Sequence, residues 1–134
     1  MKKQLIISFL FVFAVFFSLT SNLVAQNSLA GEVSNAIKNG NSKDLAKNFY
    51  SSIDLTVPGN EGTFSKSQAE LIVKDFFTKN PPKSFAINHQ GTSADGSQYS
   101  IGTYTSSSIA YRTYFIIKKF SDTYYIQQIQ FEQQ

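Results

Sequence analysis

The sequence contains no cysteine, and His89 is its single histidine. Without cysteine the chain can form no disulfide bond and no lipid-modified cysteine. One histidine and no thiolate are too few for a transition-metal site within one chain, so we expect no metal and no cofactor. The sequence also lacks a phosphate-binding glycine loop and a nucleophile-elbow motif. It therefore gives no signal for nucleotide hydrolysis or serine-based catalysis.

The sequence also lacks a large excess of positive or of negative charge. The chain has 12 basic and 9 acidic residues, and two of the basic ones, Lys2 and Lys3, precede a long apolar run. Without these two lysines, 10 basic and 9 acidic residues give a net charge of +1. So small a charge provides no attraction for nucleic acid and no reason to expect binding at a membrane surface. We therefore expect neither partner for the mature chain.

The long apolar run covers residues 5–19, and a more polar stretch follows it as far as Ala25. A basic start, an apolar centre and a small residue at the end are typical of a secretory signal peptide. We predict cleavage after Ala25, which leaves residues 26–134 as one exported domain, periplasmic or extracellular. The alternative is an uncleaved membrane anchor, which is less favoured because a spanning helix needs roughly 20 apolar residues.

Residues 84–131 contain four runs in which apolar and polar residues alternate, separated by short turns. This pattern predicts strands joined as an antiparallel meander. The third run, residues 109–117, is the richest in β-formers, so we place it centrally. Asp95-Gly96 predicts a tight turn between the first two strands.

Three positions in these runs indicate irregular pairing. The apolar positions of the last run change parity, which predicts a β-bulge near Gln127-Gln128. Gly91 and Gly102 lie within or beside strands, where glycine marks a bulge or a close approach of another group.

The residues before this sheet predict two helices followed by a hairpin. Apolar residues spaced i, i+4 and i+8 predict a helix over residues 28–38. Gly40-Asn41 favours the left-handed backbone conformation that often ends a helix. Ser42 is expected to cap a second short helix that carries Leu45 and Phe49 on one face.

A strand is predicted over residues 52–57, with a turn at residues 58–62. Ser65 and Gln68 have the spacing of a capping box at the start of a third helix. Two prolines, at positions 81 and 82, predict that this helix ends before them. Its apolar stripe consists of Ala69, Ile72, Val73, Phe76 and Phe77.

Several motifs carry a family resemblance: residues 64–70, Asp75-Phe76-Phe77, residues 89–93, residues 99–102, residues 111–114 and residues 126–131. Together with the order of elements they resemble the nuclear transport factor two-like superfamily. Within it the chain is similar to small exported bacterial proteins named only as a domain of unknown function. The resemblance implies one α+β domain over residues 26–134, with N-terminal helices packed on a curved, cone-shaped, four- to six-stranded antiparallel sheet.

This superfamily includes ketosteroid isomerases and scytalone dehydratase, which use Asp, His and Tyr residues facing the cone's interior. By residue type, the nearest candidates here are Asp54, His89 and Tyr99. We expect Asp54 to face solvent, because it lies opposite the apolar face of its own strand. We expect His89 to point inward with Phe85 and Ile87, as a base, a ligand contact or a core residue with one hydrogen bond.

Arg112 is the only arginine and lies in the middle of the predicted central strand. Its guanidinium suits the recognition of a carboxylate. The alternative places it on the outer sheet face, with its stem packed on Tyr114. Both faces of this strand are apolar, so we expect a second subunit to cover the outer one. His89, Tyr99 and Arg112 are the candidate ligand-binding residues, and we assign no catalytic residue.

Two hypotheses of function follow. The first is a non-catalytic module that holds a small apolar ligand or a partner protein, in the cone's cavity or on the sheet face. The second is a small enzyme of the isomerase or dehydratase type with His89 as base. Both kinds of protein occur in the superfamily, so the resemblance alone does not decide between them.

Overall fold

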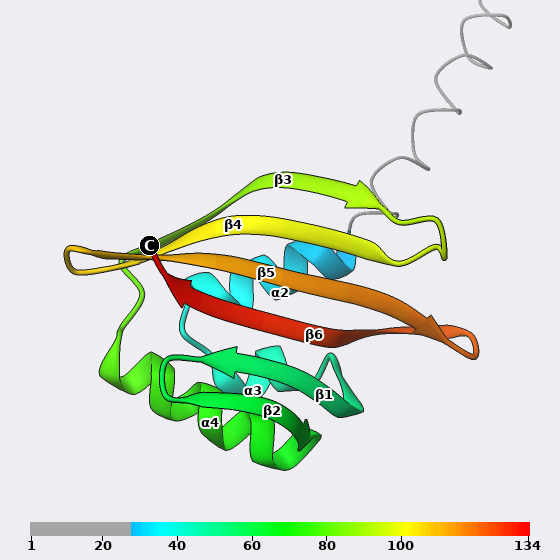
Figure 1. The fold of residues 1–134 in the computed structure, drawn as a ribbon, viewed down its shortest axis with the longest axis horizontal. Coiled ribbons are helices and arrows are strands. Elements are labelled where there is room, and N and C mark those ends of the chain that lie inside the picture. The colour runs from blue at the N-terminus through cyan, green and yellow to red at the C-terminus, as the bar shows by residue number, and fades with distance from the viewer. Residues whose placement is uncertain (1–27) are drawn as a thin grey trace, which may run out of the picture.

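The computed structural model describes residues 28–134, and the predicted signal peptide, residues 1–25, lies outside them. Figure 1 shows helices behind a sheet of long strands. In chain order the described elements are α2 (Ser28–Lys38), α3 (Ser42–Ala46), β1 (Phe49–Val57), β2 (Asn60–Ser65), α4 (Lys66–Lys79), β3 (Ser84–Thr92), β4 (Gln98–Ser106), β5 (Ile109–Phe120) and β6 (Thr123–Gln133).

The strands form one sheet in the order β2-β1-β6-β5-β4-β3. β3 to β6 form the predicted antiparallel meander, and β5 lies beside β6 in the middle of the sheet. β1 runs parallel to β6, so the prediction of a wholly antiparallel sheet was wrong at this pairing. Most of the domain connects these two strands, and a connection of that length permits a parallel pair. The predicted α+β class is confirmed.

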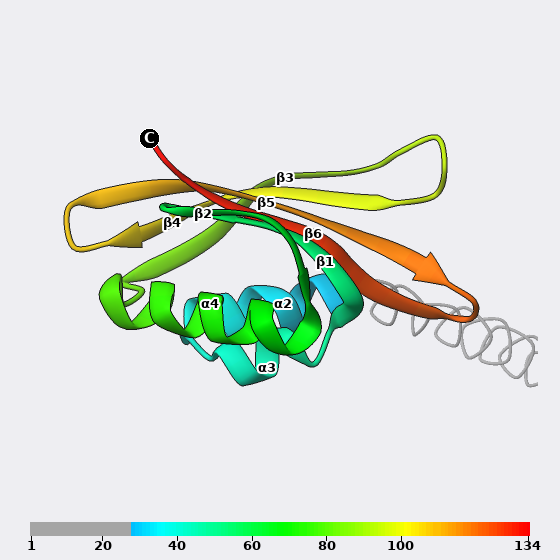
Figure 2. The ribbon, with the colours of Figure 1, turned by 60° about the horizontal axis from the view of Figure 1, so that its bottom comes forward.

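The three described helices cover one side of the curved sheet, as Figure 2 shows. No helix within residues 28–134 covers the opposite side, which we call the outer face. Within the same residues, no helix has both the length and the apolar character needed to cross a membrane.

The turn between α2 and α3 differs from the prediction by one residue. Gly40 has φ of 62°, the left-handed conformation expected after a helix. Asn41, and not Ser42, caps α3, because Asn41 Oδ1 accepts a hydrogen bond from the backbone N of Asp44 at 3.0 Å. An asparagine is as good a cap as a serine, so the two were not distinguishable by residue type.

Phe49 was predicted on the second helix, and this is wrong. The helix ends at Ala46, and Phe49 begins β1, where its side chain is 1% exposed. The carbonyl of Asn48 accepts a hydrogen bond from the backbone N of Ile126 in β6 at 2.6 Å. Pairing with β6 thus overrides the local helical pattern.

α4 has the predicted capping box. Ser65 Oγ accepts from the backbone N of Gln68 at 3.3 Å, and Gln68 Oε1 accepts from the backbone N of Ser65 at 3.4 Å. The helix ends at Lys79, before the two prolines. Its buried residues are Ala69, Val73, Phe76 and Phe77.

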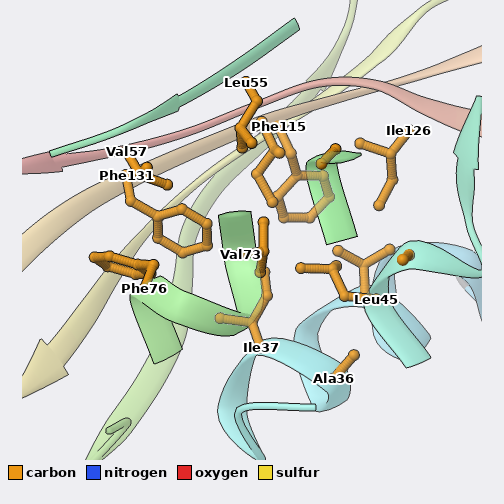
Figure 3. Packing of buried hydrophobic residues seen from close by; sticks show 14 of the residues in the cluster. Ala36, Ile37, Leu45, Leu55, Val57, Val73, Phe76, Phe115, Ile126 and Phe131 are labelled. Atoms are coloured by element: carbon orange, nitrogen blue, oxygen red, sulfur yellow. The ribbon is translucent and has the colours of Figure 1, made fainter. Parts of the chain in front are cut away.

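The core lies between the helices and the inner side of the sheet, and Figure 3 shows side chains from both layers meeting there. Phe76, near the C-terminal end of α4, has its ring centroid 4.8 Å from that of Phe131 and 5.2 Å from that of Tyr111. Aromatic side chains from α4 and from the sheet therefore pack together in this part of the core.

Candidate functional site

The alternation of side chains along β5 shows which of its residues lie on the outer face. Tyr111, Thr113, Phe115 and Ile117 are buried on the helix side. Arg112, Tyr114 and Ile116 point the other way, onto the outer face. The alternative in which Arg112 lies on the outer face, beside Tyr114, is therefore the correct one.

Two β-bulges change which residues reach the outer face. In β6, Ile116 pairs with Gln128 and Ile117 with Ile126, so Gln127 is the extra residue, as predicted. β3 has a second bulge that the apolar pattern did not indicate, since Ile87 and His89 pair with adjacent residues of β4.

This second bulge moves His89. Ile87 pairs with Gly102 and His89 with Ile101, so Asn88 is the extra residue of β3. An extra residue shifts the alternation by one, so His89 shares a face with Ile101 rather than with Ile87. The prediction that His89 points inward is wrong: it lies exposed on the outer face.

His89 and Tyr99 meet on the outer face. His89 Nε2 lies 3.2 Å from the Tyr99 hydroxyl, within hydrogen-bond distance. The Tyr99 ring lies over Gly91, its cross-strand partner, in the space where a side chain at that position would be. The predicted close approach at Gly91 is confirmed, and its cause is this tyrosine ring.

Arg112 does not join this pair. Its cross-strand partners are Thr103 on β4 and Glu132 on β6. With strands about 4.8 Å apart and residues about 3.3 Å apart, Arg112 lies roughly 12 Å from His89 along the sheet. The three candidate residues therefore share one face, but only His89 and Tyr99 touch.

The inner side of the sheet holds a different polar group, which the sequence did not reveal. Asn80, directly after α4, accepts a hydrogen bond from the Tyr104 hydroxyl on its carbonyl and one from the Tyr111 hydroxyl on Oδ1, the latter at 2.8 Å. Burial, with a smaller effect of Tyr111, raises the pKa of Tyr104 above its ordinary value. Both tyrosine hydroxyls therefore donate hydrogen bonds within the domain.

An aromatic cluster at one end of the outer face was also missed. The rings of Tyr50 and Phe120 are stacked with centroids 3.7 Å apart, and the Tyr125 ring lies 5.5 Å from Tyr50. These residues come from β1, β5 and β6. Tyr50 precedes the predicted start of its strand, so only the longer observed strand brings it onto the sheet.

The described pockets lie away from these residues. One, of about 460 Å³, is lined mostly by polar residues of α2, α3 and the segments that follow each of them. Another, of about 370 Å³, lies between the α2–α3 turn and α4. Neither includes His89, Tyr99 or Arg112. Within residues 28–134 no three His, Asp or Glu side chains come together in a way that could hold a metal ion.

Asp54 takes part in a hydrogen-bonded group across three strands. Its Oδ1 accepts from the Thr63 hydroxyl of β2 at 2.6 Å, and its Oδ2 accepts from Gln127 Nε2 of β6 at 3.3 Å. As predicted, Asp54 lies opposite the buried residues of β1, on the uncovered side of the sheet, where these two hydrogen bonds leave it half-buried.

Solved structures of other proteins share this architecture. A DUF4783 family protein from Bacteroides ovatus is 31% identical, with a TM-score of 0.71 over 77% of this chain and 93% of that one. An NTF-2 like protein of unknown function from Silicibacter pomeroyi is 13% identical, with a TM-score of 0.57 over 86% of this chain and 98% of that one. A cystatin-like domain of unknown function from Nostoc punctiforme is 12% identical, with a TM-score of 0.63 over 86% and 78%.

The two more distant similarities concern the fold alone, and they confirm the predicted nuclear transport factor two-like architecture. No curated protein matches the chain. Residues 30–132 match the family model described as "Domain of unknown function (DUF4783)". With that match and the Bacteroides structure, the chain belongs to the DUF4783 family.

Proposed function

We propose that the protein is an exported, non-catalytic interaction module that works through the outer face of its sheet, and that its partner there is a second copy of the same chain. The observation that carries this proposal is the uncovered outer face. Its centre is apolar, with four half-buried side chains from β4 and β5: Tyr99, Ile101, Tyr114 and Ile116.

The size of this face supports a stable contact. Six strands about 4.8 Å apart, with roughly nine residues each at about 3.3 Å, make a face on the order of 800 Å². A standard protein interface buries about the same area on each partner. A contiguous apolar patch such as the one at its centre usually marks an interaction site. A two-fold dimer covers such a face in both copies at once.

Oligomeric state tests the proposal. We expect light scattering on residues 26–134 to give a dimer, and Tyr114→Lys to shift it to a monomer by placing a charge in the apolar centre. Leu71→Lys is the matched control, since Leu71 is 66% exposed on α4, on the other side of the molecule. A monomeric wild type at every accessible concentration contradicts the proposal, and so does a Tyr114→Lys protein that dimerises like the wild type.

A small apolar ligand inside the cone has less support. The aromatic side chains of Phe76, Tyr104, Tyr111 and Phe131 occupy that region, and His89 does not reach it. The enzyme alternative is weakened for a related reason. A general base needs a second polar group at the same substrate atom, within an enclosed site. Within residues 28–134, the polar side chain within hydrogen-bond distance of His89 is that of Tyr99, and the pair lies on an exposed face.

Export has its own test. We expect intact-mass measurement of the protein from the periplasm or medium to give a chain that starts at Gln26 or within a few residues of it. The reason is the sequence of a basic start, an apolar run and Ala25. Recovery of the full-length chain in the membrane fraction would instead indicate an uncleaved anchor.

A further inference from the structure

A pocket of about 460 Å³ lies between α2 and α3, on the helix side of the domain. A short turn joins these two helices, and Figure 2 shows both of them on the side of the sheet opposite the outer face. The volume lies within the range of about 300–1,000 Å³ that is usual for small-molecule sites. The proposed dimer would leave this pocket open, so a ligand could bind there in either oligomeric state.

Polar side chains form both walls of the pocket. On the first wall, Glu32, Asn35 and Asn39 follow one another at spacings of three and four residues, so they share one face of α2 and of the turn that continues it. The backbone N of Asn39 donates to the carbonyl of Asn35 at 3.0 Å, which extends the helical turn to Asn39. The second wall comes from α3 and the residues after it: Asp44, Lys47 and Asn48.

Two of these six side chains have partners within the domain. Asp44 Oδ1 forms an ion pair with Lys47 Nζ at 3.1 Å, and Asp44 Oδ2 accepts a hydrogen bond from Asn41 Nδ2 at 2.9 Å. Among residues 28–134, no side-chain hydrogen bond or ion pair is made by the other four: Glu32, Asn35, Asn39 and Asn48. One carboxylate and three amides are therefore available to a ligand.

These groups define the chemistry of the ligand. Each amide offers two N–H donors and an acceptor oxygen, and a hydroxyl group both donates and accepts, so neighbouring hydroxyls match neighbouring amides. Glu32 only accepts, and with Asp44 and Lys47 it gives the pocket a net charge of −1. A neutral sugar would leave this charge without a partner, and a simple amine would leave the amides without one. A molecule with several hydroxyls and one ammonium group satisfies both.

We propose that this pocket binds a protonated amino sugar, with its ammonium group on Glu32 and its hydroxyl groups on Asn35, Asn39 and Asn48. This is a binding site in addition to the proposed dimer contact, and it does not depend on that contact. Ala36, which also lines the pocket and is 4% exposed, has a short side chain that leaves space for a sugar ring between the walls. The ligand also accounts for Asn35 inside α2, where asparagine is a poorer helix former than alanine.

Two sugars that differ in one group test the site. Residues 26–134, labelled with ¹⁵N, are titrated with glucosamine at a pH at which its amine is protonated, and separately with glucose, which has a hydroxyl in place of that amine. We expect glucosamine to shift the amide signals of α2 and α3 in the NMR spectrum. Its dissociation constant should be about tenfold lower than that of glucose, because a hydrogen bond to a charged group is the stronger kind.

Three variants assign the contacts. Glu32→Gln keeps the size of the side chain and removes its charge, so the two dissociation constants should come within about twofold of each other. Asn35→Ala removes an amide and should weaken both sugars alike. Glu61→Gln is the matched control, because it makes the same change on exposed β2, outside the pocket, and should leave both constants as in the wild type.

Each failure has a distinct meaning. Signals of α2 and α3 that do not move with glucosamine, or shifts confined to other elements, contradict the site itself. Equal constants for the two sugars in the wild type, or a Glu32→Gln protein that keeps the preference, contradict the contact between ammonium and carboxylate. Circular dichroism melts establish that the variants fold, which we expect because Glu32, Asn35 and Glu61 are exposed. None of these results depends on oligomeric state, so the site and the proposed dimer can fail separately.

Discussion

Replacement of Phe76 by alanine is expected to lower the free energy of unfolding by about 3–5 kcal/mol. Phe76 is 4% exposed and meets aromatic rings from β4, β5 and β6. Its ring centroid lies 5.5 Å from Tyr104, 5.2 Å from Tyr111 and 4.8 Å from Phe131. These rings belong to strands held by the sheet, so they cannot close the space that the lost ring leaves.

Denaturant melts of residues 26–134 measure this loss, and Ser65→Ala is the companion variant. Ser65 is the exposed N-cap of α4, so its loss should cost about 1 kcal/mol through an unsatisfied backbone N–H. Ser65 caps the start of α4 and is exposed, whereas Phe76 lies on the buried side of the same helix. Equal losses from the two variants would mean that the Phe76 side chain does not contribute to the core as its burial implies.

The parts of the fold that follow from local pattern were predictable from sequence. Alternation gave the meander, the parity change near Gln127 gave its bulge, and Ser65 with Gln68 gave the start of α4. In each case the signal lies within a few residues of the feature. The parallel β1–β6 pair was not predictable in this way, because it depends on which strand lies next to which and no local residue specifies that.

The candidate site residues were also predictable only where local pattern decides their position. The side of Arg112 follows from the regular alternation of β5, and the sequence offered it as one of two alternatives. The side of His89 does not follow from alternation, because the bulge at Asn88 reverses it. Residues 85–87 and 89–92 read as one regular strand, since the residues after the bulge are polar and leave no parity change to detect.

Gly102→Ala is expected to lower the free energy of unfolding by about 3 kcal/mol, at the upper end of the range for overpacking a core. Gly102 lies on the inner side of β4, paired with Ile87 and Thr113. A Cβ there would stand 2.5 Å from the carbonyl oxygen of Ala86 and 3.0 Å from two ring carbons of Phe85. A backbone oxygen cannot move away without disturbing the β3–β4 hydrogen bonds, so the strand pair itself must shift.

Two other glycines provide the comparison for this variant. Gly31 in α2 has no atom within 4 Å of its Cβ position, so Gly31→Ala should stabilise by about 0.5–1 kcal/mol through helix propensity. At Gly91 a Cβ would meet the Tyr99 side chain, which can rotate into solvent. Gly91→Ala should therefore cost under about 1 kcal/mol. The rotation would break the contact between Tyr99 and His89. Urea melts of the three variants should therefore rank Gly31, Gly91 and Gly102 in order of increasing cost. If Gly102→Ala costs no more than Gly91→Ala, β3 can move away from β4 at this point, and the close approach does not hold the two strands in place.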